Sequence, residues 1–547
     1  MFDALFTTTT EYQKLSHALS GKGACALFGL PASGRAQVYA ALCRQLDKPL
    51  CIVTPGEAEA TRFAADLNTL GIPAAVFPAR DYVLRPIEGT AREYEYRRLA
   101  VLGELVGGRL RAVAVPAEAL TQFTTPKEDF CANTRTLHAG DTLLRDDLLA
   151  ALFGAGYTRR AQVDGPGQFS VRGDIVDIFA PDQKMPVRME FWGDEIDTLH
   201  TFDLTTQRRE DAIDKFYLSP AREVLFGKPA DAAEQLRTFL AKQRGKKKTA
   251  MADCMAADLD LLDGGAVPVN MDKYLAVRYP HPATVLDYFD DPILVAEEPA
   301  SIREADRATA YRRGEELKSL ILDGVLCAGL DNLYADPSYL WSKTGHYRTI
   351  CAENFARSMP DQPLKDIINA PAHTLPAWNG EVAGLLEDLK PLCDAGYTVT
   401  LLAGTDRAAA GLARDLRDKG ILVTTDAAAA PAAGLVQVLA GHLSAGCEFP
   451  FAKYALLTGR AFGETSSQKK KRKKAKDALN SLTEITPGDL VVHQNHGIGR
   501  YAGIQRMAVQ GVTKDYLRIE YDKKDVLYVP VTQLDLLSRY TAPGDSD

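Results

Sequence analysis

The chain has 547 residues, of which 46% are apolar and 25% charged, and its formal net charge is −8. This length exceeds a single hydrophobic core and predicts several domains. The acidic balance excludes a protein that binds nucleic acid over its whole surface. Nine scattered cysteines without a CxxC pair fit a reducing compartment and offer no zinc site. The start lacks a signal-peptide pattern, and no stretch reaches 18 apolar residues, so we expect a cytoplasmic chain without membrane contact.

The first 120 residues alternate between short apolar runs and helical stretches. This alternation is typical of a parallel sheet covered by helices, and we assign residues 1–120 to the first part of an α/β domain. Its second part is expected at 211–352. The predicted strands are 24–28, 50–53, 74–77 and 111–115, and the predicted helices include 57–70 and 90–106.

A glycine-rich loop follows the first predicted strand. Gly29 and Gly34 have the spacing of a P-loop, GxxxxGK[ST], between a strand and a helix. Arg35 occupies the position of the phosphate-binding lysine, and Ala36 that of the hydroxyl that ligates Mg²⁺. Alanine offers no ligand, so phosphoryl transfer would lose much of its charge stabilisation. The pattern therefore predicts a degenerate nucleotide loop without hydrolysis; the alternative is a strand–turn–helix junction unrelated to nucleotide.

A second feature of nucleotide-binding proteins lies far along the chain. Residues 293–296 form an apolar run that ends in Glu297 and Glu298, which resembles a Walker B strand. Many strands end in acidic residues, so this pattern indicates a nucleotide-binding fold only together with the loop at 29–36.

Residues 121–210 differ in character from the α/β segments. Runs at 169–172, 175–179 and 187–191 read as strands, and Gly-Asp pairs at 173–174 and 193–194 read as turns. We predict a small antiparallel domain inserted into the α/β domain.

Three further segments complete the chain. Residues 353–460 carry strand candidates at 397–402, 435–439 and 454–457 and predict a second small α/β domain. Residues 461–483 include a run, 468–476, in which seven of nine residues are basic; we interpret it as a solvated linker, with a phosphate-contacting segment as the alternative. Residues 484–547 predict a hairpin, 516–521 and 526–531, within an SH3/Tudor-like β-barrel.

Two of these segments resemble known families. Residues 167–179 and 187–196 are similar to a segment shared by the excision-repair protein UvrB and the transcription-repair coupling factors. Residues 487–501, with 516–521 and 527–531, resemble the RNA-polymerase-interacting domain of coupling factors, which is related to the CarD group. UvrB lacks this second domain, so the order of the two favours the coupling-factor family over nearly the whole chain.

The resemblance implies an adaptor that recruits UvrA to RNA polymerase stalled at a lesion and so starts transcription-coupled nucleotide excision repair. In the family a two-lobed DNA translocase follows, and we expect this chain to end before it. ATP, Mg²⁺ and most DNA contacts belong to that motor, so the resemblance implies no cofactor and no enzymatic activity for this chain. The alternatives are a UvrB-like ATP-dependent damage-binding helicase and a CarD-like transcription regulator.

The resemblance also indicates residues for UvrA binding. Arg172 matches a UvrA-contacting arginine of the family, and Arg159 or Arg160 lies near a second one. Phe179 would supply an apolar anchor, while Ser170 stands where UvrB has a further arginine. The alternative is structural: Arg172 pairs with Asp174 or Asp177, and Phe179 belongs to the core.

The C-terminal segment is expected to bind the polymerase β subunit through an exposed strand edge. Met507 and Ile504 are the predicted contacts, with Arg500 at the rim and Val509 beside them. From residue 484 onward there are seven Lys and Arg against nine Asp and Glu, so the segment itself should not bind DNA. In the same segment we expect Leu517, Ile519 and Tyr521 to be core residues. We expect His493 and His496 to stabilise a turn rather than to bind a metal.

Overall fold

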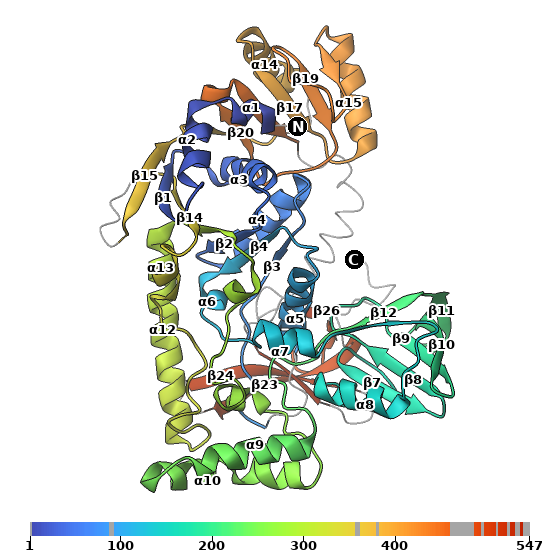
Figure 1. Cartoon of the computed structure of the whole chain (residues 1–547). Helices are drawn as coiled ribbons and strands as arrows, with labels where there is room; N and C mark the ends of the chain where they lie inside the picture. Colours follow the sequence, from blue (N-terminus) through green and yellow to red (C-terminus); the bar gives the residue numbers. More distant parts are fainter. Residues whose placement is uncertain are drawn as a thin grey trace.

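The computed structural model describes residues 3–86, 92–355, 362–378, 382–459, 486–493, 497–509, 512–521, 526–530 and 537–539. Within these ranges the chain forms a seven-stranded sheet, two six-stranded sheets, a five-stranded sheet and a two-stranded ribbon. These sheets lie in separate parts of an elongated molecule (Figure 1). The prediction of a mixed α/β chain is confirmed, with a parallel sheet and several smaller sheets.

The seven-stranded sheet is the parallel sheet predicted from the strand–helix alternation. Every pairing within it is parallel, and the strand order is β15-β1-β14-β13-β2-β4-β3. Its strands are β1 (Gly23–Phe28), β2 (Leu50–Thr54), β3 (Ala74–Val76), β4 (Ala112–Pro116), β13 (Ile293–Glu297), β14 (Arg348–Glu353) and β15 (Leu364–Asn369). Because β15 pairs with β1, the sheet continues past residue 352, where the sequence placed the end of this domain.

Helices cover both faces of this sheet, so alternate strand residues enter two different cores. On one face Cys25, Leu27 and Ile52 pack with helices α2, α3 and α4. On the other face Ala24, Ala26 and Val53 pack with α5 and α6 and the start of α12. The helices are α1 (Asp3–Thr7), α2 (Thr10–Ala18), α3 (Ala32–Leu46), α4 (Glu57–Thr69), α5 (Glu93–Val106), α6 (Ala117–Leu120) and α12 (Pro299–Leu322).

The inserted domain is built on a six-stranded sheet with the order β11-β10-β9-β8-β7-β6. The pairings are antiparallel except that between β6 and β7. Gly173 and Gly193 have φ of 60° and 64°, which the tight turns between β7 and β8 and between β9 and β10 require. The elements are α7 (Lys127–Ala132), β5 (Arg135–His138), α8 (Arg145–Gly154), β6 (Thr158–Arg159), β7 (Gln168–Arg172), β8 (Ile175–Phe179), β9 (Val187–Trp192), β10 (Glu195–Phe202), β11 (Arg209–Ala212) and β12 (Lys215–Leu218), which pairs with β5.

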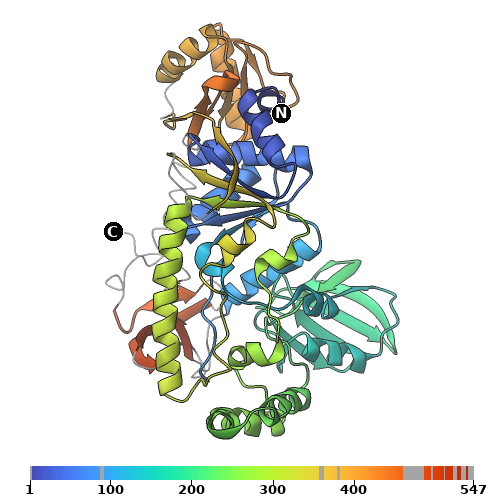
Figure 2. The same ribbon diagram turned by 60° about the vertical axis from the view of Figure 1, so that its left-hand side comes forward.

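The chain between this domain and β13 is mainly helical. The long α12, drawn in yellow-green, runs along one side of the molecule, and these helices lie beyond its lower end (Figure 2). Methionine, leucine and tyrosine side chains of α9, α10 and the segment after α12 share one core. The elements before β13 are α9 (Pro229–Ala241), α10 (Gly245–Asp263), η1 (Met271–Tyr274), α11 (Leu275–Arg278) and η2 (Val285–Tyr288), and α13 (Tyr339–Lys343) follows α12.

The second small α/β unit has the sheet order β16-β20-β21-β17-β19-β18 and contains the three predicted strands. Its residues Cys447, Phe449 and Tyr454 join the core that lies over α2 and α3, so this unit packs directly on the first domain. The elements are β16 (His373–Leu375), α14 (Val382–Asp394), β17 (Thr398–Leu402), α15 (Asp406–Asp418), β18 (Val423–Thr424), β19 (Val436–Leu439), β20 (Gly446–Phe449), η3 (Pro450–Ala452) and β21 (Tyr454–Thr458).

The C-terminal sheet has the order β25-β24-β23-β22-β26, and its pairings are antiparallel. Leu517 and Ile519 are fully buried and Tyr521 packs at the edge of their cluster, as predicted. Closure into an SH3/Tudor-like barrel stays a prediction, and the basic run 468–476 lies outside the described residues. The strands are β22 (Leu490–His493), β23 (Gly497–Val509), β24 (Val512–Glu520), β25 (Val526–Pro530) and β26 (Leu537–Arg539). Among the described helices of the whole chain, none is long and apolar enough to cross a membrane.

Candidate functional site

The glycine-rich loop lies between β1 and α3, as its pattern predicts. Gly29 has φ +87°, and a Cβ there would meet Asn369 and Ala370 at 3.0 and 3.1 Å. Gly34 lies in the first turn of α3, where a Cβ would meet Sγ of Cys447 at 2.8 Å. Protein atoms from the end of β15 and from β20 therefore lie against the loop. The nucleotide-loop interpretation stays a prediction.

Arg35 is buried at the centre of an ion cluster, with 1% of its side chain exposed. Its Nη1 donates to Oε2 of Glu297, and its Nη2 donates to Oε1 of Glu298 at 2.5 Å. Nη2 also donates to Oδ1 of Asn354 at 2.7 Å, and Nε donates to the Leu30 carbonyl at 2.8 Å. The two features singled out in the sequence, the loop and the acidic strand end, thus meet through a guanidinium–carboxylate contact.

Burial sets the protonation behaviour of this cluster. Desolvation raises the pKa of Glu297 even though Arg35 acts in the opposite direction. The Tyr39 hydroxyl donates to Oε1 of Glu297 at 2.5 Å, and burial followed by the Glu297 charge raises the tyrosine pKa well above its usual value. The neighbouring Ala36 is fully buried. As arranged, Arg35 has its charge neutralised by protein carboxylates.

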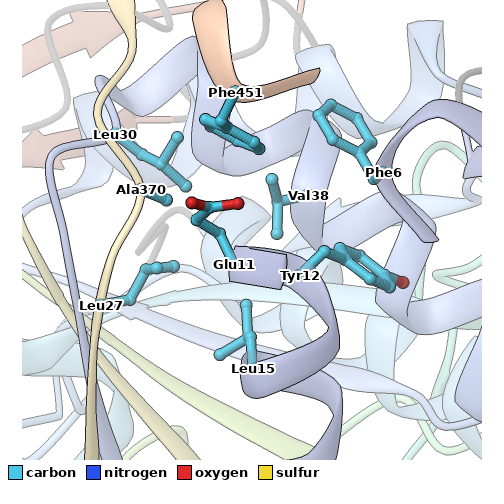
Figure 3. Close-up of a pocket in the computed structure, with 9 residues that line it drawn as sticks. All are labelled: Phe6, Glu11, Tyr12, Leu15, Leu27, Leu30, Val38, Ala370 and Phe451. Atoms are coloured by element: carbon cyan, nitrogen blue, oxygen red, sulfur yellow. The ribbon is translucent and has the colours of Figure 1, made fainter. Parts of the chain in front are cut away.

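A small cavity lies near the loop, between α2 and α3, and Figure 3 shows the Glu11 carboxylate pointing into it. Its volume of about 10 Å³ matches one water molecule and is far below that of a nucleotide site. It is lined by Phe6, Glu11, Tyr12, Leu15, Leu27, Leu30, Val38, Ala370 and Phe451.

A second buried ion cluster joins the inserted domain to the parallel-sheet domain. Glu223, which follows β12, is fully buried and pairs with Arg98 of α5 at 2.7 Å and with Arg80 at 3.1 Å. Arg80 also pairs with Asp272 at 2.7 Å. Burial raises the pKa of Glu95, but Arg80 and the other nearby arginines outweigh it and lower that pKa to about 2. These contacts fix the base of the inserted domain.

The inserted sheet has one face in the core and one outer face. Phe169, Val176 and Met189 point into the core. The outer face comprises the alternate positions of β7, β8 and β9: Ser170, Arg172, Ile175, Asp177, Arg188, Glu190 and Trp192.

Arg172 is both paired and accessible on the outer face. Its Nη2 donates to Oδ2 of buried Asp177 at 2.6 Å, while 48% of its side chain remains exposed. Arg188 holds the same carboxylate with two bonds, at 2.7 and 3.0 Å. Arg172 therefore pairs with Asp177, as the structural alternative expected, and its exposed N–H groups can still bind a partner.

Other predicted contact residues divide into exposed and buried groups. Arg159 and Arg160 are exposed at the β6 edge. Phe179 lies in a buried cluster with Val163 and Phe202, so the expectation of an accessible apolar anchor is wrong for the free chain. Ser170 is also fully buried.

Trp192, which was not among the predicted contact residues, is 82% exposed. It lies at the end of β9, beside the β9–β10 turn and at the same end of the sheet as Arg172, because Arg172 pairs with Ile175 and Ile175 with Glu190. Successive side chains of β9 alternate between the two faces of the sheet, so Trp192 lies on the face opposite to that of buried Phe191. This alternation could have indicated from the sequence that Trp192 is exposed. An exposed tryptophan and an exposed arginine at the same end of a sheet are typical of a protein-binding surface.

The C-terminal sheet exposes apolar side chains on β23. Ile498 and Ile504 are 51% and 44% exposed, and Arg500 is exposed with Nη1 donating to the Gly488 carbonyl at 2.8 Å. Residues 503–509 pair with β24, whereas β22 pairs only with 497–500, so among the described strands the second half of β23 has one open edge. Met507 and Val509 lie on that half, and their side chains fall outside the described residues.

His493 has a different environment from the predicted turn. It is buried, and its Nε2 lies 3.6 Å from Oε1 of Glu93 at the start of α5. His493 thus lies at a contact between the C-terminal sheet and the first domain, which local sequence patterns do not reveal. His496 lies outside the described residues.

Two segments of the chain match known domain families. The family described as the UvrB interaction domain matches residues 136–224, and the CarD-like/TRCF RID domain matches residues 485–541. The chain therefore has two segments similar to interaction domains, one that includes the inserted sheet and one that includes the C-terminal sheet.

Similarity to curated proteins covers nearly the whole chain. The chain is 28% identical to the transcription-repair-coupling factor of Bacillus subtilis over 94% of this chain and 45% of that protein. It is 27% identical to that of Staphylococcus haemolyticus over 94% and 45%, and 25% identical to that of Staphylococcus aureus strain MRSA252 over 99% and 47%. The chain is thus similar to transcription-repair coupling factors, and it spans about half the length of the curated relatives it matches.

Proposed function

We propose that this chain is an adaptor in transcription-coupled DNA repair that binds UvrA through the inserted domain and RNA polymerase through the C-terminal sheet. One observation carries the proposal: two domains of interaction families lie on one chain, and each exposes side chains suited to a protein partner. These are Arg172 and Trp192 on the first domain and Ile498 and Ile504 on the second.

For UvrA, the proposed contact surface is the end of the outer face that carries Arg172 and Trp192. Replacing Arg172 with alanine leaves Asp177 paired with Arg188, so folding should be preserved. A hot-spot arginine contributes upwards of roughly 1 kcal/mol, which corresponds to at least about fivefold weaker binding. The single variant Trp192→Ala should weaken UvrA binding more than Arg172→Ala does, by roughly 2 kcal/mol.

The test is titration calorimetry of the full chain with purified UvrA. Arg414→Ala, which removes an exposed arginine of α15, is the matched control and should bind like the parent. Parental affinity in folded Arg172→Ala and Trp192→Ala variants would place the interface elsewhere. Absence of UvrA binding together with retained polymerase binding would instead favour a transcription regulator.

For RNA polymerase, the proposed contact is the β subunit, and the proposed surface is the open edge of β23. Ile504 supplies an exposed apolar side chain there, and Met507, Val509 and Arg500 lie on the same strand. A charge at Ile504 would have to be desolvated in the interface, so Ile504→Arg should reduce binding of the full chain to a β-subunit fragment by more than about tenfold. Leu422→Arg, at a 64% exposed leucine of the second α/β unit, is the control. Equal binding by both variants, or tight binding of this segment to duplex DNA, would contradict the assignment.

We also propose that the loop at 29–36 has a structural role and does not turn over ATP. Arg35 is already held by Glu297 and Glu298, and Ala36 offers no oxygen to Mg²⁺. The purified chain should show no ATPase activity above background, and Arg35→Lys with Ala36→Ser should not create any. Turnover by the parent that disappears in Arg35→Ala would overturn this part of the proposal.

A further inference from the structure

Two cysteines meet where α10 packs against the segment that follows α12. Cys254 lies on α10 and is half-buried, whereas Cys327 is 7% exposed in the same apolar core. The two thiols are far apart in sequence and lie on neither of the proposed partner surfaces.

Several contacts hold these two segments together. Sγ of Cys254 donates to the Val325 carbonyl at 2.9 Å. Cys327 follows Val325 by two residues, and each of the two cysteines alters the pKa of the other. A Cβ built on Gly329 would lie 3.3 Å from the methyl group of Met251, one helical turn before Cys254, so the post-α12 segment lies directly along α10.

Charged groups surround the pair on both sides. Lys273, buried after α10, donates from Nζ to the Cys254 carbonyl at 3.1 Å and pairs with Asp258 at 2.5 Å. Lys247 and Asp331 face Cys327. The hydrogen bond from Cys327, with help from Lys273 and against burial, lowers the pKa of Cys254 to about 7.

We propose that Cys254 and Cys327 form a peroxide-reactive dithiol that closes to a disulfide between α10 and the end of α12. The Cys254 thiolate attacks one oxygen of hydrogen peroxide, the O–O bond breaks, and Cys254 sulfenic acid and hydroxide form; the hydroxide takes up a proton to become water. The Cys327 sulfur then attacks the sulfenic sulfur, the S–S bond forms, and the hydroxyl group leaves with the Cys327 proton as a second water. Two thiols are oxidised and one peroxide is reduced to two waters.

The half-buried position of Cys254 admits a small oxidant, and the buried Cys327 is placed to resolve the sulfenic acid before further oxidation. The closed bond would join two segments that the unfolded chain leaves free, and so it should stabilise the helical region around α9, α10 and α12.

The test is oxidation of the full chain with a small excess of hydrogen peroxide, followed by alkylation, trypsin digestion without reductant and mass spectrometry. Cleavage after Lys248, Lys273, Lys318 and Lys343 isolates each cysteine in its own peptide, 249–273 and 319–343. We expect these two peptides as the dominant linked pair and a higher melting temperature, both reversed by dithiothreitol. Cys131→Ser, which removes an exposed thiol, should retain both effects, and Cys254→Ser should lose both. The parent chain alone decides the matter if Cys254→Ser misfolds: alkylated or sulfinic Cys254 without linked peptides would overturn the proposal.

Discussion

Removal of the Arg35 side chain should strongly destabilise the first domain. In Arg35→Leu, the carboxylate of Glu297 stays buried and loses its ion pair, while the Tyr39 hydroxyl still donates a hydrogen bond to it. Breaking a buried pair by removing one partner typically costs about 3–5 kcal/mol. The lost bond from Arg35 Nε to the Leu30 carbonyl adds roughly 1 kcal/mol. We expect a total loss of about 4–6 kcal/mol at pH 8.

The pH dependence of this variant has a definite sign. The folded-state pKa of Glu297 is already raised by burial, and loss of Arg35 removes the strongest influence that lowers it, so the pKa rises further. A group whose pKa is raised on folding stabilises the protein at low pH, and this contribution is lost as the pH rises through the folded value. The deficit of Arg35→Leu should therefore shrink between pH 8 and pH 5. Glu297→Gln added to Arg35→Leu should recover a large part of it at pH 8.

The assay is urea unfolding followed by far-UV circular dichroism and by tryptophan fluorescence, to which Trp341 near α12 contributes. Arg312→Leu, at an arginine of α12 that is 60% exposed, is the matched control and should change stability by less than about 1 kcal/mol. A loss below about 1 kcal/mol in Arg35→Leu, or a deficit independent of pH, would refute the reasoning.

Three further outcomes follow from particular side chains. Phe179→Ala should destabilise the inserted domain by roughly 3–5 kcal/mol in thermal unfolding, and UvrA affinity of the folded fraction should persist. Asp306→Asn should stabilise the chain by roughly 2–3 kcal/mol at pH 8 but not at pH 4 in urea titrations, because burial raises the pKa of Asp306 to about 6 and its protonated form favours folding. Gly34→Ala should lower the melting temperature, although alanine favours helices, because the added Cβ would clash with Sγ of Cys447. Adding Cys447→Ala to this variant should relieve the clash. An unchanged melting temperature in Gly34→Ala would contradict the contact.

The sequence by itself determined the strands of the parallel sheet and the hairpins of the inserted domain. Strands buried on both faces are apolar along most of their length, so 24–28, 50–53 and 293–296 were visible as uninterrupted apolar runs. Glycines at turns that need positive φ marked the inserted hairpins. The two domain resemblances rested on long local motifs, which need no tertiary information.

Tertiary structure alone decided what each of those segments touches. Arg35 and Glu297 are 262 positions apart, and only the parallel order of β1, β14 and β13 brings them together. Alternation placed Phe179 on the same face as Arg172, but it does not specify that Val163 and Phe202 cover one and leave the other open. Whether a side chain is a contact or a core residue depends on segments distant in sequence, because burial results from the packing of elements that local patterns describe one at a time.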